Sequence, residues 1–250
     1  MRLDVVSGAK QPNPSLFQNG DFLWPRKPGD YVPYVARIEP QRPDQQRVDA
    51  VLWEAERDKY LQFLSRLPSP DSVDLERKRL LGKLTFRNFL DLYESDPDPQ
   101  HAGAIESEGK GLSVGHVGIV ELDEQHQPWV IEAVLKVGVR RISYEQWIEQ
   151  RKDNLVWLGR LADQPPENRN EISAQAKTYL GTPYDFWNLD LDDTRGFYCS
   201  KLVWLSIFRT LDFGVDGNDD PHRSFWFSPK QLFNAKTVQH VFAPAGDYLI

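Results

Sequence analysis

The chain has 250 residues, of which 40% are hydrophobic and 12% aromatic, and this is enough apolar material to bury a full core. Its formal net charge of −7 argues against a nucleic-acid role, because phosphate binding requires clustered Lys and Arg. The basic pairs at 140–141 and 151–152 are short, and we expect them to be solvated. A single cysteine excludes an internal disulfide and a zinc site built from several thiolates.

Targeting signals are not visible in the sequence. It contains no apolar run of signal-peptide length at residues 1–8 and no run of about 18 apolar residues elsewhere. We therefore expect no membrane span. Two locations remain open: the cytoplasm, or the periplasm after export by a route that needs no cleaved signal.

Residues 1–36 predict the opening strand of a sheet, in which a turn at Asn19 and Gly20 precedes a short apolar run that Pro25 ends. Residues 37–111 are charged, and their apolar residues recur at spacings of three and four, which predicts helices. This stretch is too long for an ordinary connection. We predict a helical insertion at 37–111, either a lid that sets substrate choice or a peripheral stabilising element.

Two β-rich segments, 114–120 and 129–134, flank a polar stretch that suits a hairpin connection. If this hairpin is symmetric about Glu124, His116 and Glu132 become direct cross-strand neighbours on one face. A carboxylate in that position can hold an imidazole so that its other nitrogen accepts a proton from a thiol. The alternative is an exposed cross-strand pair without a function. A one-residue bulge would put His116 and Glu132 on opposite faces of the sheet.

A helix is predicted from Pro165 and Pro166 to about Leu180, with Gly181 as its C-terminal cap. An acidic loop follows at 185–193. It lacks the glycine and distal glutamate of an EF-hand, so we expect a solvated loop or a contact with a cationic part of a substrate.

The only cysteine, Cys199, stands where the glycine-bearing loop 194–198 enters an apolar, helix-like stretch. A thiol in the first turn of a helix faces unpaired backbone N–H groups and the positive end of the helix dipole, and both favour the thiolate. This position indicates a nucleophile. The alternative is a small buried hydrophobic residue.

Four motifs in chain order resemble the YaeF/YiiX family of permuted papain-like amidases, relatives of the NlpC-type cell-wall peptidases. They are the segments 115–120, 130–133, 181–186 and 198–203, with the sequences GHVGIV, VIEA, GTPYDF and YCSKLV. Histidine, acid and cysteine follow one another in that order, as in the circularly permuted branch, whereas the cysteine comes first in the unpermuted relatives. The resemblance covers residues 1–36 and 112–235.

The resemblance implies an α+β fold: residues 1–250 would form a single permuted papain-like catalytic domain, with an antiparallel sheet or barrel packed against helices. It implies that Cys199 is the nucleophile, His116 the general base and then acid, and Glu132 the residue that orients His116. The backbone N–H of Cys199 would also be an oxyanion donor. Tyr184 matches a tyrosine that lines the active site, although a core aromatic is the alternative.

Two residues beside the cysteine depart from the family pattern. Tyr198, which we consider for the substrate or oxyanion side of the site, stands where NlpC-type relatives commonly carry Asp. Lys201 stands where this branch usually has Glu, and we expect it to be solvated. Analogy therefore assigns neither residue a role.

The predicted activity is hydrolysis of an amide bond through an acyl-enzyme, without a metal or cofactor. The resemblance favours peptide or peptidoglycan stem-peptide substrates, in a secreted antibacterial effector with an immunity or secretion partner or in a cytoplasmic recycling enzyme. One alternative is a lipid or thioester acyl hydrolase or transferase of the lecithin:retinol acyltransferase type. Another is a catalytically inactive binding module.

Overall fold

The computed structural model describes residues 8–26, 115–185, 188, 190–221, 227–245 and 248, together with single residues and short runs between 54 and 85. The chain divides into two compact units, one of residues 1–30, 115–248 and 250, the other of residues 31–114 and 249. Every predicted site residue belongs to the first unit. The helical insertion predicted at 37–111 falls almost entirely outside the described residues and stays a prediction.

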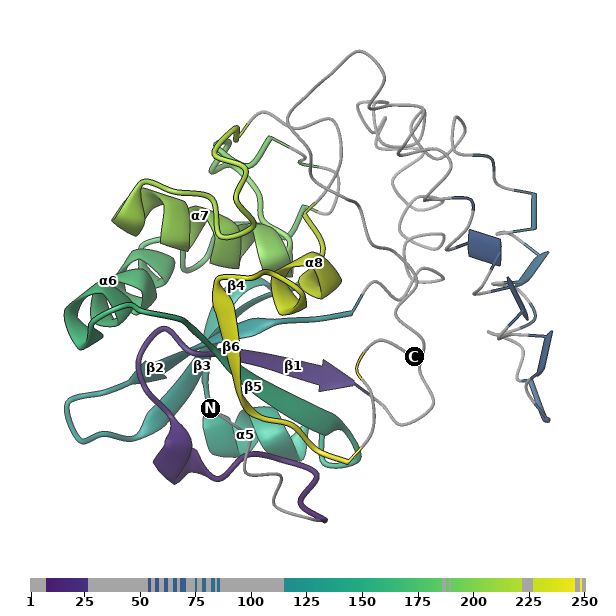
Figure 1. Ribbon diagram of the computed structural model, residues 1–250, viewed down its shortest axis with the longest axis horizontal. Helices are drawn as coiled ribbons and strands as arrows, with labels where there is room; N and C mark the ends of the chain where they lie inside the picture. The colour runs from purple at the N-terminus through teal and green to yellow at the C-terminus, as the bar shows by residue number, and fades with distance from the viewer. Residues whose placement is uncertain are drawn as a thin grey trace. The chain divides into compact units, whose positions relative to one another are not determined.

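A six-stranded sheet forms the centre of the first unit, in the order β4-β3-β2-β1-β5-β6, with every neighbouring pair antiparallel. The strands are β1 (Phe22–Arg26), β2 (Gly118–Leu122), β3 (Pro128–Val134), β4 (Gly138–Ser143), β5 (Leu155–Leu161) and β6 (Val238–Phe242). β4 and β6 end the sheet, so it is open and not closed into a barrel (Figure 1). The predicted α+β class with an antiparallel sheet is confirmed.

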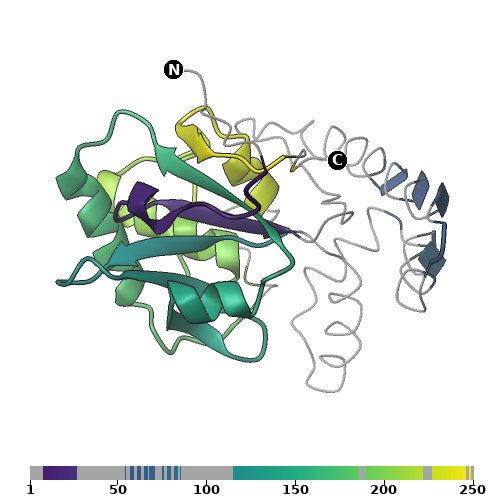
Figure 2. The same ribbon diagram turned by 90° about the horizontal axis from the view of Figure 1, so that it is seen from below.

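Helices cover both faces of this sheet. Those of the first unit are the 3₁₀ turn η1 (Pro14–Leu16) and the helices α5 (Tyr144–Glu149), α6 (Pro166–Lys177), α7 (Cys199–Leu211) and α8 (Pro229–Phe233). α6 and α7 pack against β2 and β3 on one face, and α5 packs against β3 and β4 on the other (Figures 1 and 2). The sheet thus separates α5 from the helix that begins at the cysteine.

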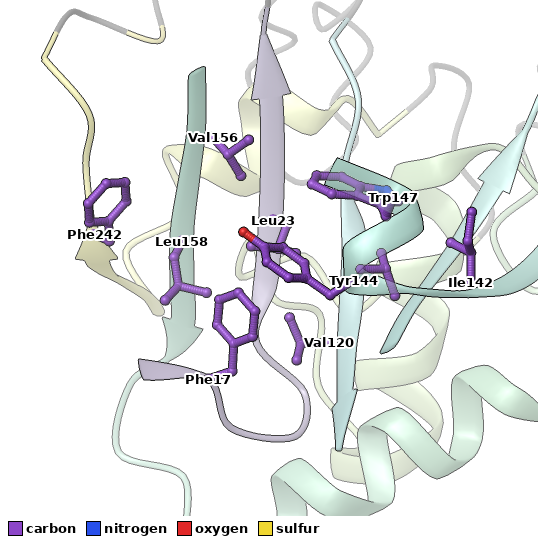
Figure 3. Packing of buried hydrophobic residues seen from close by; sticks show 10 residues of the cluster. Phe17, Leu23, Val120, Ile142, Tyr144, Trp147, Val156, Leu158 and Phe242 are labelled. Carbon is purple, nitrogen blue, oxygen red and sulfur yellow. The ribbon is translucent and has the colours of Figure 1, made fainter. Parts of the chain in front are cut away.

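The hydrophobic core on the α5 side fixes this arrangement (Figure 3). Tyr144 and Trp147 of α5 pack there with Phe17 on apolar side chains that alternate along the strands. Trp147 is fully buried, and an aromatic side chain of this size contributes roughly 2–3 kcal/mol by leaving water. The sheet residues of this cluster are Leu23, Val120, Val130, Ile142, Val156, Leu158 and Phe242.

The sequence predicts that Pro25 ends the first strand. Pro25 instead lies within β1, opposite Val156. The backbone N–H of Val156 donates to the carbonyl of Lys10, 2.9 Å away, so this pair requires no N–H from the proline. The predicted helix does begin at Pro166, but it ends at Lys177, and Gly181 follows in a turn with φ +84°.

Candidate active site

Cys199 is the first residue of α7, as predicted, and only 5% of it is exposed. The preceding residue, Tyr198, is extended, and no side chain caps the helix start. The N–H groups of the first turn and the positive end of the helix dipole therefore lie at the sulfur.

The loop before the cysteine is held by a short parallel pairing of Tyr184 with Phe197. The Phe197 N–H donates to the Pro183 carbonyl at 3.0 Å, and the Phe197 carbonyl accepts from the Asp185 N–H at 2.9 Å. Gly196 makes this approach possible, because a Cβ atom there would lie 2.5 Å from the Asp185 Cβ. The motif around Tyr184 is thus brought to Cys199.

His116 and Glu132 meet: the imidazole Nε2 lies 2.7 Å from the Glu132 Oε2. The predicted register is wrong by two residues, because Val120 faces Val130 and the hairpin is symmetric about Gln125. His116 precedes β2 and reaches the carboxylate from outside the strand. A shift of two residues keeps Glu132 on the same face, since side chains alternate with a period of two.

His116 also hydrogen-bonds to the side chain of Cys199. Nε2 faces Glu132, which leaves Nδ1 for the sulfur. Burial lowers the pKa of His116, but the hydrogen bonds and charges of Cys199 and Glu132 outweigh it and raise that pKa to about 9. The imidazole of His116 is therefore protonated at neutral pH.

Glu132 is fully buried and accepts five hydrogen bonds from four side chains. Its Oε2 accepts from His116, from Trp147 Nε1 at 2.8 Å and from Arg151 Nη2 at 2.9 Å. Its Oε1 accepts from Arg140 Nε at 2.9 Å and Nη2 at 2.6 Å. Burial alone would raise the pKa of Glu132, yet His116, Arg151 and Trp147 hold it well below its ordinary value.

The prediction that both basic pairs are solvated is therefore wrong for Arg140, Arg141 and Arg151. The side chains of Arg140 and Arg151 are 24% and 15% exposed and bind a buried carboxylate. Arg140 lies directly opposite Glu132 across β3 and β4. Pairing these two strands in the sequence would therefore have predicted the contact between Arg140 and Glu132. Arg151 follows α5, and no local pattern points from there to Glu132.

Of the two predicted tyrosines, Tyr184 interacts electrostatically with Cys199, and burial together with the cysteine's charge raises its pKa. The Tyr198 hydroxyl instead accepts the backbone N–H of Phe227 at 3.1 Å in the interior. Sequence reasoning missed Tyr248, whose hydroxyl is buried without a hydrogen-bond partner in the described part of the chain. Burial, then the charge of Cys199, raises the pKa of Tyr248.

Lys201 is fully buried, so the expectation that it is solvated is wrong. Its Nζ donates to the carbonyl of Asn188 at 3.4 Å and lies 5.5 Å from the centre of the Phe197 ring. Burial lowers the pKa of Lys201 to about 8, against the charges of Asp193 and the other loop acids. The loop acids are themselves paired, Asp193 with Arg195 at 2.7 Å and Asp192 with Arg209.

Within the described ranges, no three His, Cys, Asp or Glu side chains come together in a way that could hold a metal ion. The same part of the chain contains no helix long and apolar enough to cross a membrane.

The fold and the chain order of histidine, acid and cysteine define a circularly permuted papain-like class. Residues 100–219 match the family described as "Permuted papain-like amidase enzyme, YaeF/YiiX, C92 family". This match bears out the predicted resemblance to the YaeF/YiiX permuted papain-like amidases, a family of cysteine peptidases and amidases.

Two proteins from Escherichia coli are similar to the chain. The uncharacterized protein YiiX of strain K12 is 30% identical over 118 residues, which are 47% of this chain and 55% of that protein. The chain thus matches about half the length of this relative. The crystal structure of the metalloprotein YiiX from strain O157:H7 (DUF1105) aligns with 90% of this chain and 97% of its own, at 18% identity and a TM-score of 0.46.

Proposed function

We propose that this protein hydrolyses an amide bond through an acyl-enzyme, with Cys199 as nucleophile, His116 as proton carrier and Glu132 as the residue that orients His116. One observation carries this proposal: a single imidazole bridges a thiol at a helix start and a buried carboxylate. Nucleophile, base and orienting group are the three parts that acyl transfer by a thiol requires.

The proposed reaction begins when the Cys199 thiolate attacks the carbonyl carbon of the amide. The oxyanion that forms accepts a hydrogen bond from the backbone N–H of Cys199, which opens an uncapped helix. The imidazolium of His116 then gives its proton to the departing amine, and the C–N bond breaks to leave a thioester. In the second half, His116 takes a proton from water, whose oxygen attacks the thioester; the C–S bond then breaks, which releases the acid and returns the Cys199 thiolate.

For the substrate we propose a peptide amide, and within that class the stem peptide of peptidoglycan. This finer choice is supported by the resemblance to the YaeF/YiiX family, whose relatives include the NlpC-type cell-wall peptidases. An enzyme with this substrate would suit an antibacterial effector held in check by an immunity protein, or a recycling hydrolase inside the cell.

The test is digestion of purified peptidoglycan by the wild type and by Cys199→Ala, with the products identified by mass spectrometry. We expect new amine and carboxyl ends only with the wild type. Mass spectrometry of the intact protein should detect the acyl adduct, and the single cysteine of the chain makes its site unambiguous. The proposed wall activity is wrong if both proteins give the same products.

A second candidate is acyl hydrolysis or transfer on lipids or thioesters, which uses the same thiolate and base. Exposed apolar side chains favour it: Leu135 and Val137 in the β3–β4 turn are 40% and 56% exposed, and Leu180 is 42% exposed. These segments are joined by the hydrogen bond from Gly181 N–H to the Val139 carbonyl. Parallel assays with an acyl thioester and a peptide amide separate the two candidates, because only the preferred substrate class should give rapid turnover.

A further inference from the structure

The charge around Glu132 exceeds what is needed to balance one carboxylate. Two guanidinium groups, from Arg140 and Arg151, bind it directly, and His116 adds a third cation when protonated. Glu132 itself is completely buried, so water contributes little to its solvation.

The two arginines act on different oxygens. Arg140 occupies Oε1 with two N–H groups, at 2.9 and 2.6 Å. Arg151 shares Oε2 with the imidazole: Arg151 Nη2 lies 2.9 Å and His116 Nε2 2.7 Å from that one atom. Arg151 and His116 therefore compete for the same oxygen, and their positive charges lie within a few ångströms of each other.

Contacts from α5 hold both arginines in this geometry. The Arg151 guanidinium lies 4.5 Å from the centre of the Trp147 ring, and its Nη1 donates to the Trp147 carbonyl at 3.3 Å. Trp147 in turn donates to Oε2, and Arg140 donates to Gln150 Oε1 at 2.9 Å. Burial and the charge of Arg140 lower the pKa of Arg151, whereas Glu132 raises it.

We propose that Arg151, with Arg140 in support, is a positioning residue that offsets the charge of Glu132, so that the carboxylate fixes the His116 ring without retaining its proton too strongly. The proposal rests on the proposed catalytic role of His116. A carboxylate without the arginines would stabilise the imidazolium further and oppose the transfer of its proton to the leaving amine.

The titratable groups that face this centre come from several elements. His116 precedes β2, Arg140 lies on β4, Arg151 follows α5, and Cys199 opens α7. Tyr184 and Tyr248 interact electrostatically with the cysteine and stay protonated, because burial raises the pKa of both. Of the cationic groups, only the arginines keep their charge between pH 5 and 10.

The test uses alkylation of Cys199 by iodoacetamide, followed as a function of pH. The chain has one cysteine, so a single mass adduct reports this thiol alone. The alkaline inflection of the rate marks loss of the His116 proton and is expected near pH 9 in the wild type. We expect Arg151→Met to move it upward by about one pH unit, the effect of one charge in a partly screened site.

Three variants serve as controls. Lys152→Met removes an exposed charge next in the chain and should leave the inflection in place. Arg151→Lys keeps the charge and should stay within about 0.3 pH units of the wild type, and Arg140→Met should shift upward by less than Arg151→Met, because Arg140 binds the other oxygen.

An unchanged or lowered inflection in Arg151→Met overturns the proposal, as does a shift in Arg151→Lys equal to that in Arg151→Met. If circular dichroism shows that Arg151→Met is unfolded, Arg140→Met decides: an upward shift supports the proposal, and any other result overturns it. Alkylation needs no substrate. A failure to find a cleaved amide would therefore overturn the proposed hydrolysis but would not change the result of the alkylation test.

Discussion

Glu121 and Glu132 are two carboxylates on neighbouring strands that differ in one decisive partner. Glu121 is 5% exposed and pairs with Arg141 at 2.5 Å and Lys177 at 2.8 Å, whereas Glu132 is fully buried and pairs with Arg140 and Arg151. Only Glu132 also binds a histidine, and this histidine reaches the cysteine. Burial and ion pairs alone therefore do not distinguish Glu132, the carboxylate proposed to orient His116, from Glu121.

Adjacent arginines on β4 create the two networks. Arg140 and Arg141 point to opposite faces of the sheet because neighbouring residues in a strand alternate. Arg140 meets Glu132 on the side of α5, and Arg141 meets Glu121 on the side of α6, which supplies Lys177. An open hollow of about 560 Å³ beside Glu121 admits water, so the loss of a partner there can be compensated by solvent.

The largest expected difference between the two carboxylates is in catalysis. Glu132→Gln should lower kcat/KM roughly 10²- to 10⁴-fold, because an amide cannot orient and stabilise the imidazolium as a carboxylate does. Glu121→Gln should change kcat/KM by less than about threefold. The measurement is turnover of the substrate identified by the peptidoglycan digestion, with both variants checked for folding by circular dichroism. Equal losses in the two variants would remove the distinction between the networks.

The same carboxylate should also make stability depend on pH. Because the pKa of Glu132 in the folded protein lies below its ordinary value of 4.5, ionised Glu132 stabilises the fold above pH 4.5. This contribution should diminish progressively as the pH falls below 4.5 toward the folded-state pKa. Urea unfolding from pH 3 to 6 measures it, and Glu132→Gln should show a shallower decline than the wild type. An identical decline in both proteins would contradict the assignment.

The histidine, acid and cysteine could be found from the sequence because local patterns reveal each of them. Cys199 follows a glycine loop and opens an apolar helix, and alternation in the hairpin puts Glu132 within reach of His116 despite the wrong register. Arg151 and Tyr248 could not be found, because tertiary packing alone brings them to the site. The burial of Lys201 could not be predicted for a related reason. A lysine is buried only when other segments of the chain enclose it, and here the acidic loop does so.

A steric change on the Glu132 side should have a smaller effect than loss of the carboxylate. A Cβ atom on Gly118 would lie 2.6 Å from Val130 Cγ1 and 3.6 Å from Glu132 Cβ, so Gly118→Ala must displace the buried Val130 side chain of β3. We expect a loss of about 1–3 kcal/mol in the free energy of unfolding, measured by urea titration.

The matched control is Gly181→Asn, where an added Cβ meets nothing within 4 Å and Asn tolerates the positive φ. It should cost about 1 kcal/mol or less. A greater loss of unfolding free energy in this control than in Gly118→Ala would contradict the view that close packing of β2 on β3 holds His116 and Glu132 together.

The smallest effect is expected at Lys177, the second cation of Glu121. Its side chain is 44% exposed, compared with 15% for Arg151, so water and salt screen its pairing. Lys177→Met should lower the free energy of unfolding by at most about 0.5 kcal/mol and leave the alkylation profile of Cys199 unchanged. A shift of that profile comparable to the one expected for Arg151→Met would mean that His116 responds to cations on either face of the sheet. Direct contact with Glu132 would then not explain the effect of Arg151 on the pKa of His116.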